Sequence, residues 1–190
     1  MNLLWPKLRL AWLPEMLASA GLGTLIAGLY GIAHDQITYE ISPEYFTRLK
    51  FAQFRWANIG LPPRVFVVEI GFLATWWVGF AAGWFLARIT IPTCSVREVF
   101  RLSRRGFLIM LGFGLAGTCA GYLFGLTQRL QPATSGIAIF AADLGITDVP
   151  NFVRVAYIHN ASYLGGLGGL IVALIYAKCQ RSSASPSDIK

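Results

Sequence analysis

Four long apolar runs, separated by short segments that hold almost all of the charged residues, constrain this chain more than any other feature. The runs cover about residues 16–33, 65–87, 106–126 and 155–177, and Glu69 is the charged residue inside them. Each run is close to the ~20 residues that a helix needs to cross ~30 Å of hydrocarbon. We therefore predict an all-α integral membrane protein built as a four-helix bundle. Residues 1–181 would form a single membrane domain, and residues 182–190 a disordered cytosolic tail.

The composition agrees with this class. Charged residues make up 13% of the 190 residues, whereas soluble domains carry roughly a quarter. The net charge of +7 could indicate nucleic-acid binding, but no basic soluble domain interleaved with aromatic residues is present to carry it. The lipid bilayer is therefore the expected partner, and nucleic acid is not.

The distribution of Lys and Arg predicts the orientation. The N-terminal segment, the connection between the second and third runs, and the C-terminal segment together carry more Lys and Arg than the other two connections. The positive-inside rule then places both termini in the cytosol. The first and third connections would lie on the outer side of the membrane.

The first connection carries a helix signal of its own. Ser42, Pro43 and Glu44 suit an N-cap, a first turn and the positive end of a helix dipole, in that order. Apolar residues then recur at helical spacing up to Trp56, which predicts an amphipathic helix in the outer interface. Two interpretations stay open: a lid over a site between the spans, or a connector anchored in lipid.

Glycines recur four residues apart within three of the runs. Residues at this spacing share a helix face, and small residues let helix backbones approach closely. The faces serve either packing within one bundle or association into a homo-oligomer or a larger membrane complex. The glycines concerned are Gly79 and Gly83; Gly117, Gly121 and Gly125; and Gly165 and Gly169.

Polar residues suited to metal binding gather at the outer ends of three runs. The two histidines of the chain, His34 and His159, are expected at similar depth, with Asp35 and Glu69 near them. Ionisable side chains inside a membrane are costly and mark functional sites by default. Imidazole and carboxylate groups suit Zn, Fe, Cu or Mn, so His34, Asp35, Glu69 and His159 are the predicted ligands. The residues predicted to hydrogen-bond to these ligands and orient them are Asn160, Glu44 and Tyr39.

Two segments resemble a known family. HDQITYEISPEYF (residues 34–46) and IHNASYLGG (residues 158–166) are similar to segments of an uncharacterised family of small four-helix proteins of the bacterial inner membrane. The resemblance implies a multi-pass protein of that membrane. It implies no activity and assigns no role to any residue.

The leading functional hypothesis is an outer-side polar site that binds a metal ion or a small polar ligand, in a protein that could be a membrane-embedded enzyme. In that case Asp35 or Glu69 would act as ligand or general base, and Asn160 would orient the reacting groups. Three alternatives use the same residues: a structural polar network in a non-catalytic subunit, a proton relay, and a small proton- or ion-coupled transporter.

Overall fold

A computed structural model describes residues 9–91, 93–128 and 136–182. Its four long helices are α1 (Leu13–Ile41), α3 (Pro63–Thr90), α4 (Val96–Thr127) and α6 (Val149–Ser182). All four are long and apolar enough to cross a membrane. The protein is thus an all-α, multi-pass membrane bundle, as the sequence predicts. The predicted tail lies outside the described residues from Ser183 onward.

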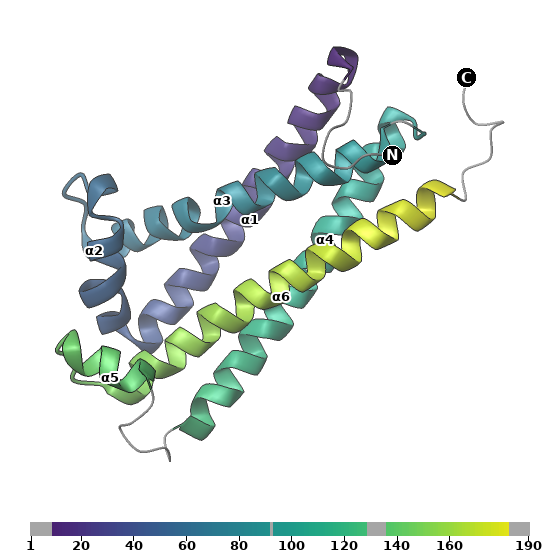
Figure 1. Ribbon diagram of the computed structural model, residues 1–190. Coiled ribbons are helices and arrows are strands. Elements are labelled where there is room, and N and C mark those ends of the chain that lie inside the picture. The colour runs from purple at the N-terminus through teal and green to yellow at the C-terminus, as the bar shows by residue number, and fades with distance from the viewer. Residues whose placement is uncertain (1–8, 92, 129–135, 183–190) are drawn as a thin grey trace.

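Shorter elements complete the chain. A 3-10 turn, η1 (Leu10–Trp12), leads into α1. The connection between α1 and α3 contains a π-helix, η2 (Tyr45–Lys50), then α2 (Phe51–Gln53) and a 3-10 turn, η3 (Arg55–Ala57). The connection between α4 and α6 contains α5 (Gly136–Asp143), which includes the apolar residues in the middle of this connection. Figure 1 shows α2 and α5 at the same end of the bundle, which we call the α2/α5 end.

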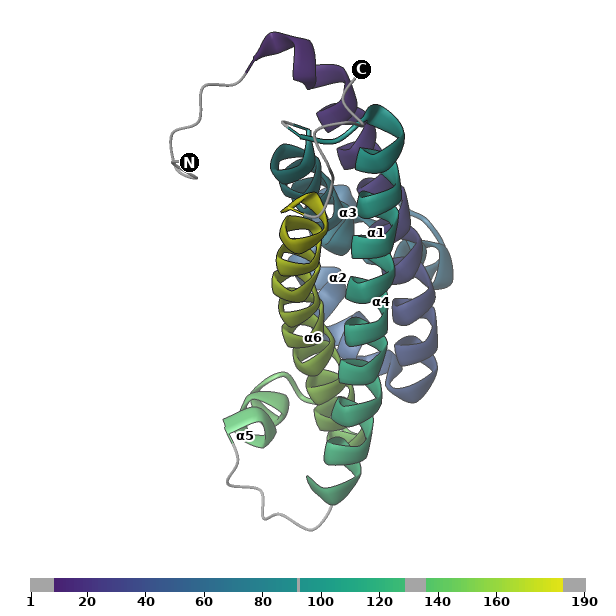
Figure 2. The same cartoon turned by 90° about the vertical axis from the view of Figure 1, so that its right-hand side faces the viewer.

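The helices form two antiparallel pairs. α1 packs mainly on α3, and α4 packs mainly on α6; Figures 1 and 2 show α4 and α6 side by side along most of their length. A Cβ atom added at Gly79 would overlap the Gly23 carbonyl oxygen, and one added at Gly117 would overlap the Ala161 carbonyl oxygen. The glycine faces therefore bring backbones together inside each pair. Association with other chains through glycine faces stays a prediction.

Local hydrogen bonds and a proline determine where α4 and α6 begin and where α1 ends. Ser95 and Glu98 form a capping box at the start of α4, which satisfies two backbone N–H groups that the helix cannot. At the start of α6, Asp148 accepts a hydrogen bond from the Asn151 backbone N–H (3.2 Å). α1 ends at Ile41 because Ser42 precedes Pro43, and a residue before proline is disfavoured in the α region. Ser42 is extended (φ −145°, ψ 92°).

α1 is longer than its predicted span, which was expected to close at Ala33. Gln36 to Ile41 hold no proline or glycine, and the Thr38 hydroxyl donates back to the His34 carbonyl (3.0 Å). The helix therefore continues for two more turns. His34 and Asp35 consequently lie within α1, with their side chains held at fixed angles by the helix instead of standing in a loop.

The connection after α1 turns into the bundle. Tyr45, Phe46 and Lys50 of η2 are buried, and Phe46 and Tyr45 belong to an apolar cluster with Phe152 and Val155 of α6. Ser42 Oγ accepts a hydrogen bond from the Tyr45 N–H (3.3 Å), which is the capping role that the sequence predicts. The burial of η2 favours the lid interpretation over that of a connector anchored in lipid.

Candidate metal centre between α1 and α6

Three side chains from two helices meet at one carboxylate oxygen. Asp35 Oδ1 lies 3.2 Å from His159 Nε2 and 3.2 Å from His34 Nδ1. The two imidazole rings are in edge contact, with 4.7 Å between their centroids. His159 is 2% exposed and Asp35 is 5% exposed. The topology thus brings together two histidines that lie 125 positions apart in the numbering of the chain, one on α1 and one on α6.

The Val155 carbonyl fixes the state of the His159 ring. It lies 3.0 Å from His159 Nδ1, and because a carbonyl can only accept, Nδ1 must carry a proton. In the neutral ring, Nε2 then presents a lone pair to Asp35 Oδ1, which is also an acceptor when the carboxyl group is ionised. Two acceptors at 3.2 Å repel each other. The contact is therefore favourable only when a further proton or a metal cation joins them.

One ring nitrogen of His34 has no hydrogen-bond partner among the described residues. Its side chain is 8% exposed, and its Nδ1 faces Asp35. Its Nε2 is buried and has no hydrogen-bond partner among the residues that the structure describes. A buried polar atom without a partner is costly and calls for an explanation. A nitrogen in this state could accept a proton or ligate a cation.

Aromatic rings close the cluster on the side of η2. Tyr45 stacks on His159, with 4.8 Å between centroids and 29° between planes, and Phe46 contacts the same ring at 6.1 Å. Burial raises the pKa of the Tyr45 hydroxyl, and the negative charge of Asp35 adds to that rise. Tyr45 is therefore a neutral phenol that shields the cluster from water.

Lys50 brings a buried positive charge to the same region. It ends the π-helix η2 and is 8% exposed. Burial lowers the pKa of its ammonium group, and the negative charge of Asp35 opposes that shift. None of the ion pairs found within residues 9–91, 93–128 and 136–182 includes Lys50. Its ammonium lies about 6 Å from two aromatic rings, 5.9 Å from that of Tyr45 and 6.0 Å from that of Phe54.

No family model, curated protein or solved structure matches the chain. The geometry of the site is therefore the basis for the proposed function.

The other predicted site residues lie apart from the His34–Asp35–His159 group. Within the described part of the chain, the candidate metal-binding group contains only these three residues. Glu69 is on α3, and its Oε2 is buried without a hydrogen-bond partner among the described residues. Asn160 is exposed, because adjacent residues on a helix do not face the same way.

Glu44 and Tyr39 hold the α2/α5 end together. Glu44 accepts hydrogen bonds from the backbone N–H groups of Thr147 (3.1 Å) and Asp148 (2.8 Å), directly before α6. The Tyr39 ring contacts Phe46 (5.5 Å between centroids) and lies under the Arg64 guanidinium (5.1 Å). Both residues join η2 and its neighbours, and among the described residues neither forms a hydrogen bond, an ion pair or a ring contact with His34 or His159.

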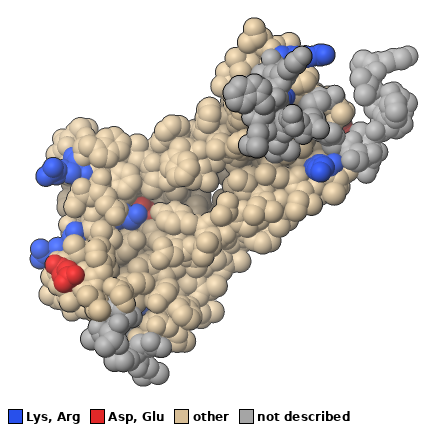
Figure 3. All heavy atoms as spheres, in the orientation of Figure 1, with Lys and Arg blue, Asp and Glu red and all other residues tan. Residues whose placement is uncertain are grey.

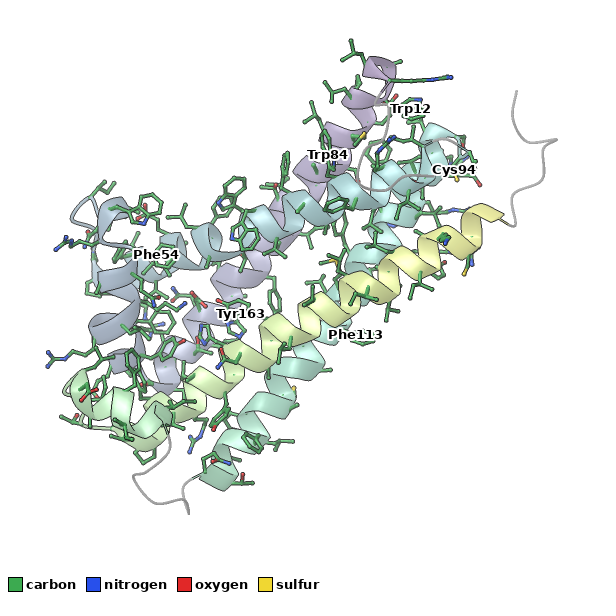
Figure 4. All side chains as sticks on the ribbon, viewed as in Figure 1. Trp12, Phe54, Trp84, Cys94, Phe113 and Tyr163 are labelled. Atoms are coloured by element: carbon green, nitrogen blue, oxygen red, sulfur yellow. The ribbon has the colours of Figure 1, made fainter. Side chains whose placement is uncertain are left out.

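A large cavity extends from the cluster between the two helix pairs. Its volume is about 720 Å³, and His34, Asp35, Lys50 and Gln53 line one end. Figure 3 shows a hollow between α3 and α6, with a basic and an acidic side chain adjoining at the end nearer α2. Figure 4 shows Tyr163, which also lines the cavity, reaching from α6 toward the other helix pair. Sequence reasoning missed Lys50, Gln53 and the cavity.

Proposed function

We propose that this chain is a multi-pass inner-membrane protein that binds one transition-metal ion between His34, Asp35 and His159. The observation that carries the proposal is the contact between His159 Nε2 and Asp35 Oδ1 at 3.2 Å, with the Val155 carbonyl holding the proton of the ring on Nδ1. A cation between the two acceptors turns a repulsive contact into two bonds.

The spacing of the three groups supports this proposal. Zinc bonds of 2.0–2.1 Å in a tetrahedral arrangement place neighbouring ligand atoms about 3.3 Å apart. Asp35 Oδ1 lies 3.2 Å from a nitrogen of each histidine, and the three ligand atoms lie within 4.8 Å of one another. Small side-chain rotations would therefore suffice to bring all three onto one ion.

The donor set narrows the choice of metal and the kind of site. Two imidazoles and one carboxylate suit Zn²⁺ and Fe²⁺. Three protein ligands leave a position open for water or a substrate, which is characteristic of catalytic sites, whereas structural zinc sites are closed by four. The Val155 carbonyl would serve as the outer partner that orients the His159 ring.

Elemental analysis tests the proposal directly. The protein would be expressed with added zinc, iron, manganese and copper, purified in detergent without chelators, and analysed by mass spectrometry for all four metals. We expect about one ion per chain in the wild type, since three ligands define a single site. His159→Ala and Asp35→Asn should reduce the metal content to background.

The matched control is Asp143→Asn, which removes an exposed carboxylate on α5 and should leave the metal content unchanged. Circular dichroism and a single gel-filtration peak would establish that each variant is folded. Equal metal content in wild type and His159→Ala, both folded, would rule out the proposed ion site.

A specific observation favours a second candidate, a proton relay. A proton satisfies the contact between His159 and Asp35 as well as a cation does. Glu69 offers a further carboxylate, whose buried Oε2 has no hydrogen-bond partner among the described residues. Intramembrane carboxylates and histidines form the relays of pumps and transporters. Proton flux into liposomes that stops in Glu69→Gln, together with an absence of bound metal, would support this function instead.

A further inference from the structure

The cavity between the helix pairs is polar at one end and apolar elsewhere. At the polar end, Asp35 and His34 of α1 face the same space as Lys50 and Gln53 from the connection after α1. The remaining lining comes from all four long helices and consists almost entirely of apolar, glycine and aromatic residues. Examples are Ile26, Leu73, Val78, Phe107, Met110 and Leu170.

The dimensions match one chain of a lipid. On α1 the lining runs from Asp35 to Gly23, which at 1.5 Å per residue is about 18 Å. Half of a bilayer's hydrocarbon core is about 15 Å thick. The cavity thus spans about the depth of one leaflet, and its volume of about 720 Å³ falls within the range of small-molecule sites.

The mouth of the cavity faces the region where lipid would lie. Three lining residues on the two helices that flank the hollow in Figure 3 are about half exposed: Trp77 (57%) on α3, and Tyr163 (47%) and Leu167 (58%) on α6. All three belong to the apolar helices that could span a membrane. An amphiphile could enter sideways from the bilayer without passing through water.

Lys50 indicates that a ligand bound at the polar end of the cavity would carry a negative charge. An ammonium group on a buried residue is costly unless it is paired. Lys50 is 8% exposed without an ion pair among the described residues, and the effect of its burial on its pKa outweighs that of the Asp35 charge. It also ends a π-helix, a rare element that is found frequently at functional sites. The amide of Gln53 adds a hydrogen-bond donor beside it.

We propose that this cavity binds an amphiphile with an anionic head group, a phosphate or a carboxylate, and a single long apolar tail. The head group would pair with Lys50 at the α2/α5 end, next to His34, and the tail would extend along α1 toward Gly23. The proposal goes beyond metal binding and does not depend on it.

Equilibrium binding in nanodiscs tests the head group. The probes are radiolabelled hexadecyl phosphate, palmitate and hexadecanol, which share a tail length and differ in head group. We expect hexadecyl phosphate or palmitate to bind at least about tenfold more tightly than hexadecanol, because a charge-assisted hydrogen bond contributes that much or more. Preference between the two anions identifies the source, a phosphate-bearing lipid or a fatty acid.

Matched variants separate the head group from the tail. Lys50→Met should lose about tenfold in affinity, whereas Arg48→Met, which removes an exposed cation from the same π-helix, should change affinity little. Gly166→Leu places a side chain in the cavity at a position where an added Cβ meets no atom within 4 Å. It should block the tail of every probe. Its control is Gly112→Leu, equally free of contacts but outside the cavity.

Three results would overturn the proposal: no probe binds to folded wild-type protein, hexadecanol binds as tightly as the anions, or Gly166→Leu binds all probes normally. Metal content, measured in parallel, keeps this test distinct from that of the ion site. Gly166→Leu should retain its metal even when it loses the amphiphile.

Discussion

The contacts within each helix pair differ in kind from the contacts between the pairs. Within the pairs, glycines bring backbone against backbone, as at Gly31 and Gly71 or at Gly121 and Tyr157. Between the pairs, side chains make the contacts: an apolar cluster joins Leu86 of α3 to Phe107 of α4 and Ala173 of α6, and polar side chains add hydrogen bonds. The Tyr30 hydroxyl bridges Thr118 (3.0 Å) and Ser162 (2.8 Å).

This difference explains why the site and the cavity lie where they do. Close backbone packing leaves no room for a ligand, so the space is found between the pairs. Between the pairs the glycines meet side chains, as Gly106 meets Leu86, so the helices approach less closely there, and hydrogen bonds between membrane helices add only about 0.6 kcal/mol each on average. The comparison indicates two pairs with close backbone contact, joined to each other by apolar and polar side chains, with the candidate ligand site between them.

The largest effect should come from disrupting a pair. Gly121→Leu places a side chain against the backbone of Tyr157 and Ile158, which should destabilise the α4–α6 pair by about 3 kcal/mol or more, because overpacking in a rigid contact cannot relax. Unfolding in mixtures of dodecyl maltoside and SDS measures it. Gly112→Leu, on the same helix but without neighbours within 4 Å, is the control. Equal destabilisation by both would contradict the proposed role of the glycine face.

An intermediate effect should follow from removing the shared carboxylate. Because a proton or a cation must join Asp35 to His159 for their contact to be favourable, Asp35→Ala removes a bonded partner of the imidazoles and should destabilise the protein by about 1.5–3 kcal/mol, the range for hydrogen bonds to charged groups. Each helix pair should stay intact. The distribution of distances between spin labels on α3 and α4 should therefore broaden, and the distribution between labels on α4 and α6 should not. A broader distance distribution within the α4–α6 pair would show that the His34–Asp35–His159 group also supports packing inside that pair, and not only the contact between the pairs.

The sequence predicts the helices far better than it predicts the site. Apolar runs of about 20 residues define the four spans because a membrane permits few alternatives, and the apolar stretch around Ile137 lies within α5. The approach of His34 to His159 was also expected, since the topology brings those helix ends to the same side.

The rest depends on three-dimensional detail. Ser42 before Pro43 could have revealed that α1 extends to Ile41, but the π-helix that buries Lys50 has no clear sequence signal. The cavity arises from how far the two pairs diverge, and no local pattern encodes that distance. Glu69 lies near the predicted depth yet outside the group, because depth along a helix does not determine which way a side chain faces.

A smaller effect should result from Tyr30→Phe, which removes one hydroxyl and both of its hydrogen bonds between the pairs. The expected loss is about 0.5–1.5 kcal/mol. Thr75→Val gives a matched comparison within a pair, because the Thr75 hydroxyl donates to the Ala27 carbonyl across α1 and α3 (2.8 Å). Tyr30→Phe should broaden the distribution of spin-label distances between the pairs, and Thr75→Val should not. The reverse result would mean that hydrogen bonds, more than glycines, hold the α1–α3 pair.

The smallest effect should appear at the α2/α5 end, where Glu44 joins η2 to the start of α6. Hydrogen bonds from the Asp148 and Thr147 backbone N–H groups and from the Thr147 hydroxyl lower the pKa of Glu44. A group whose pKa is depressed by folding stabilises the folded state above its unfolded pKa of about 4.3, and that contribution is lost as the pH falls through the folded pKa. Glu44→Gln should therefore be slightly less stable than wild type at pH 7, with the difference vanishing at more acidic pH. Unfolding midpoints of both proteins across this range measure the effect. A difference that grows on acidification would mean that Glu44 is stabilised in its protonated form, and that the connections at the α2/α5 end are joined by other contacts.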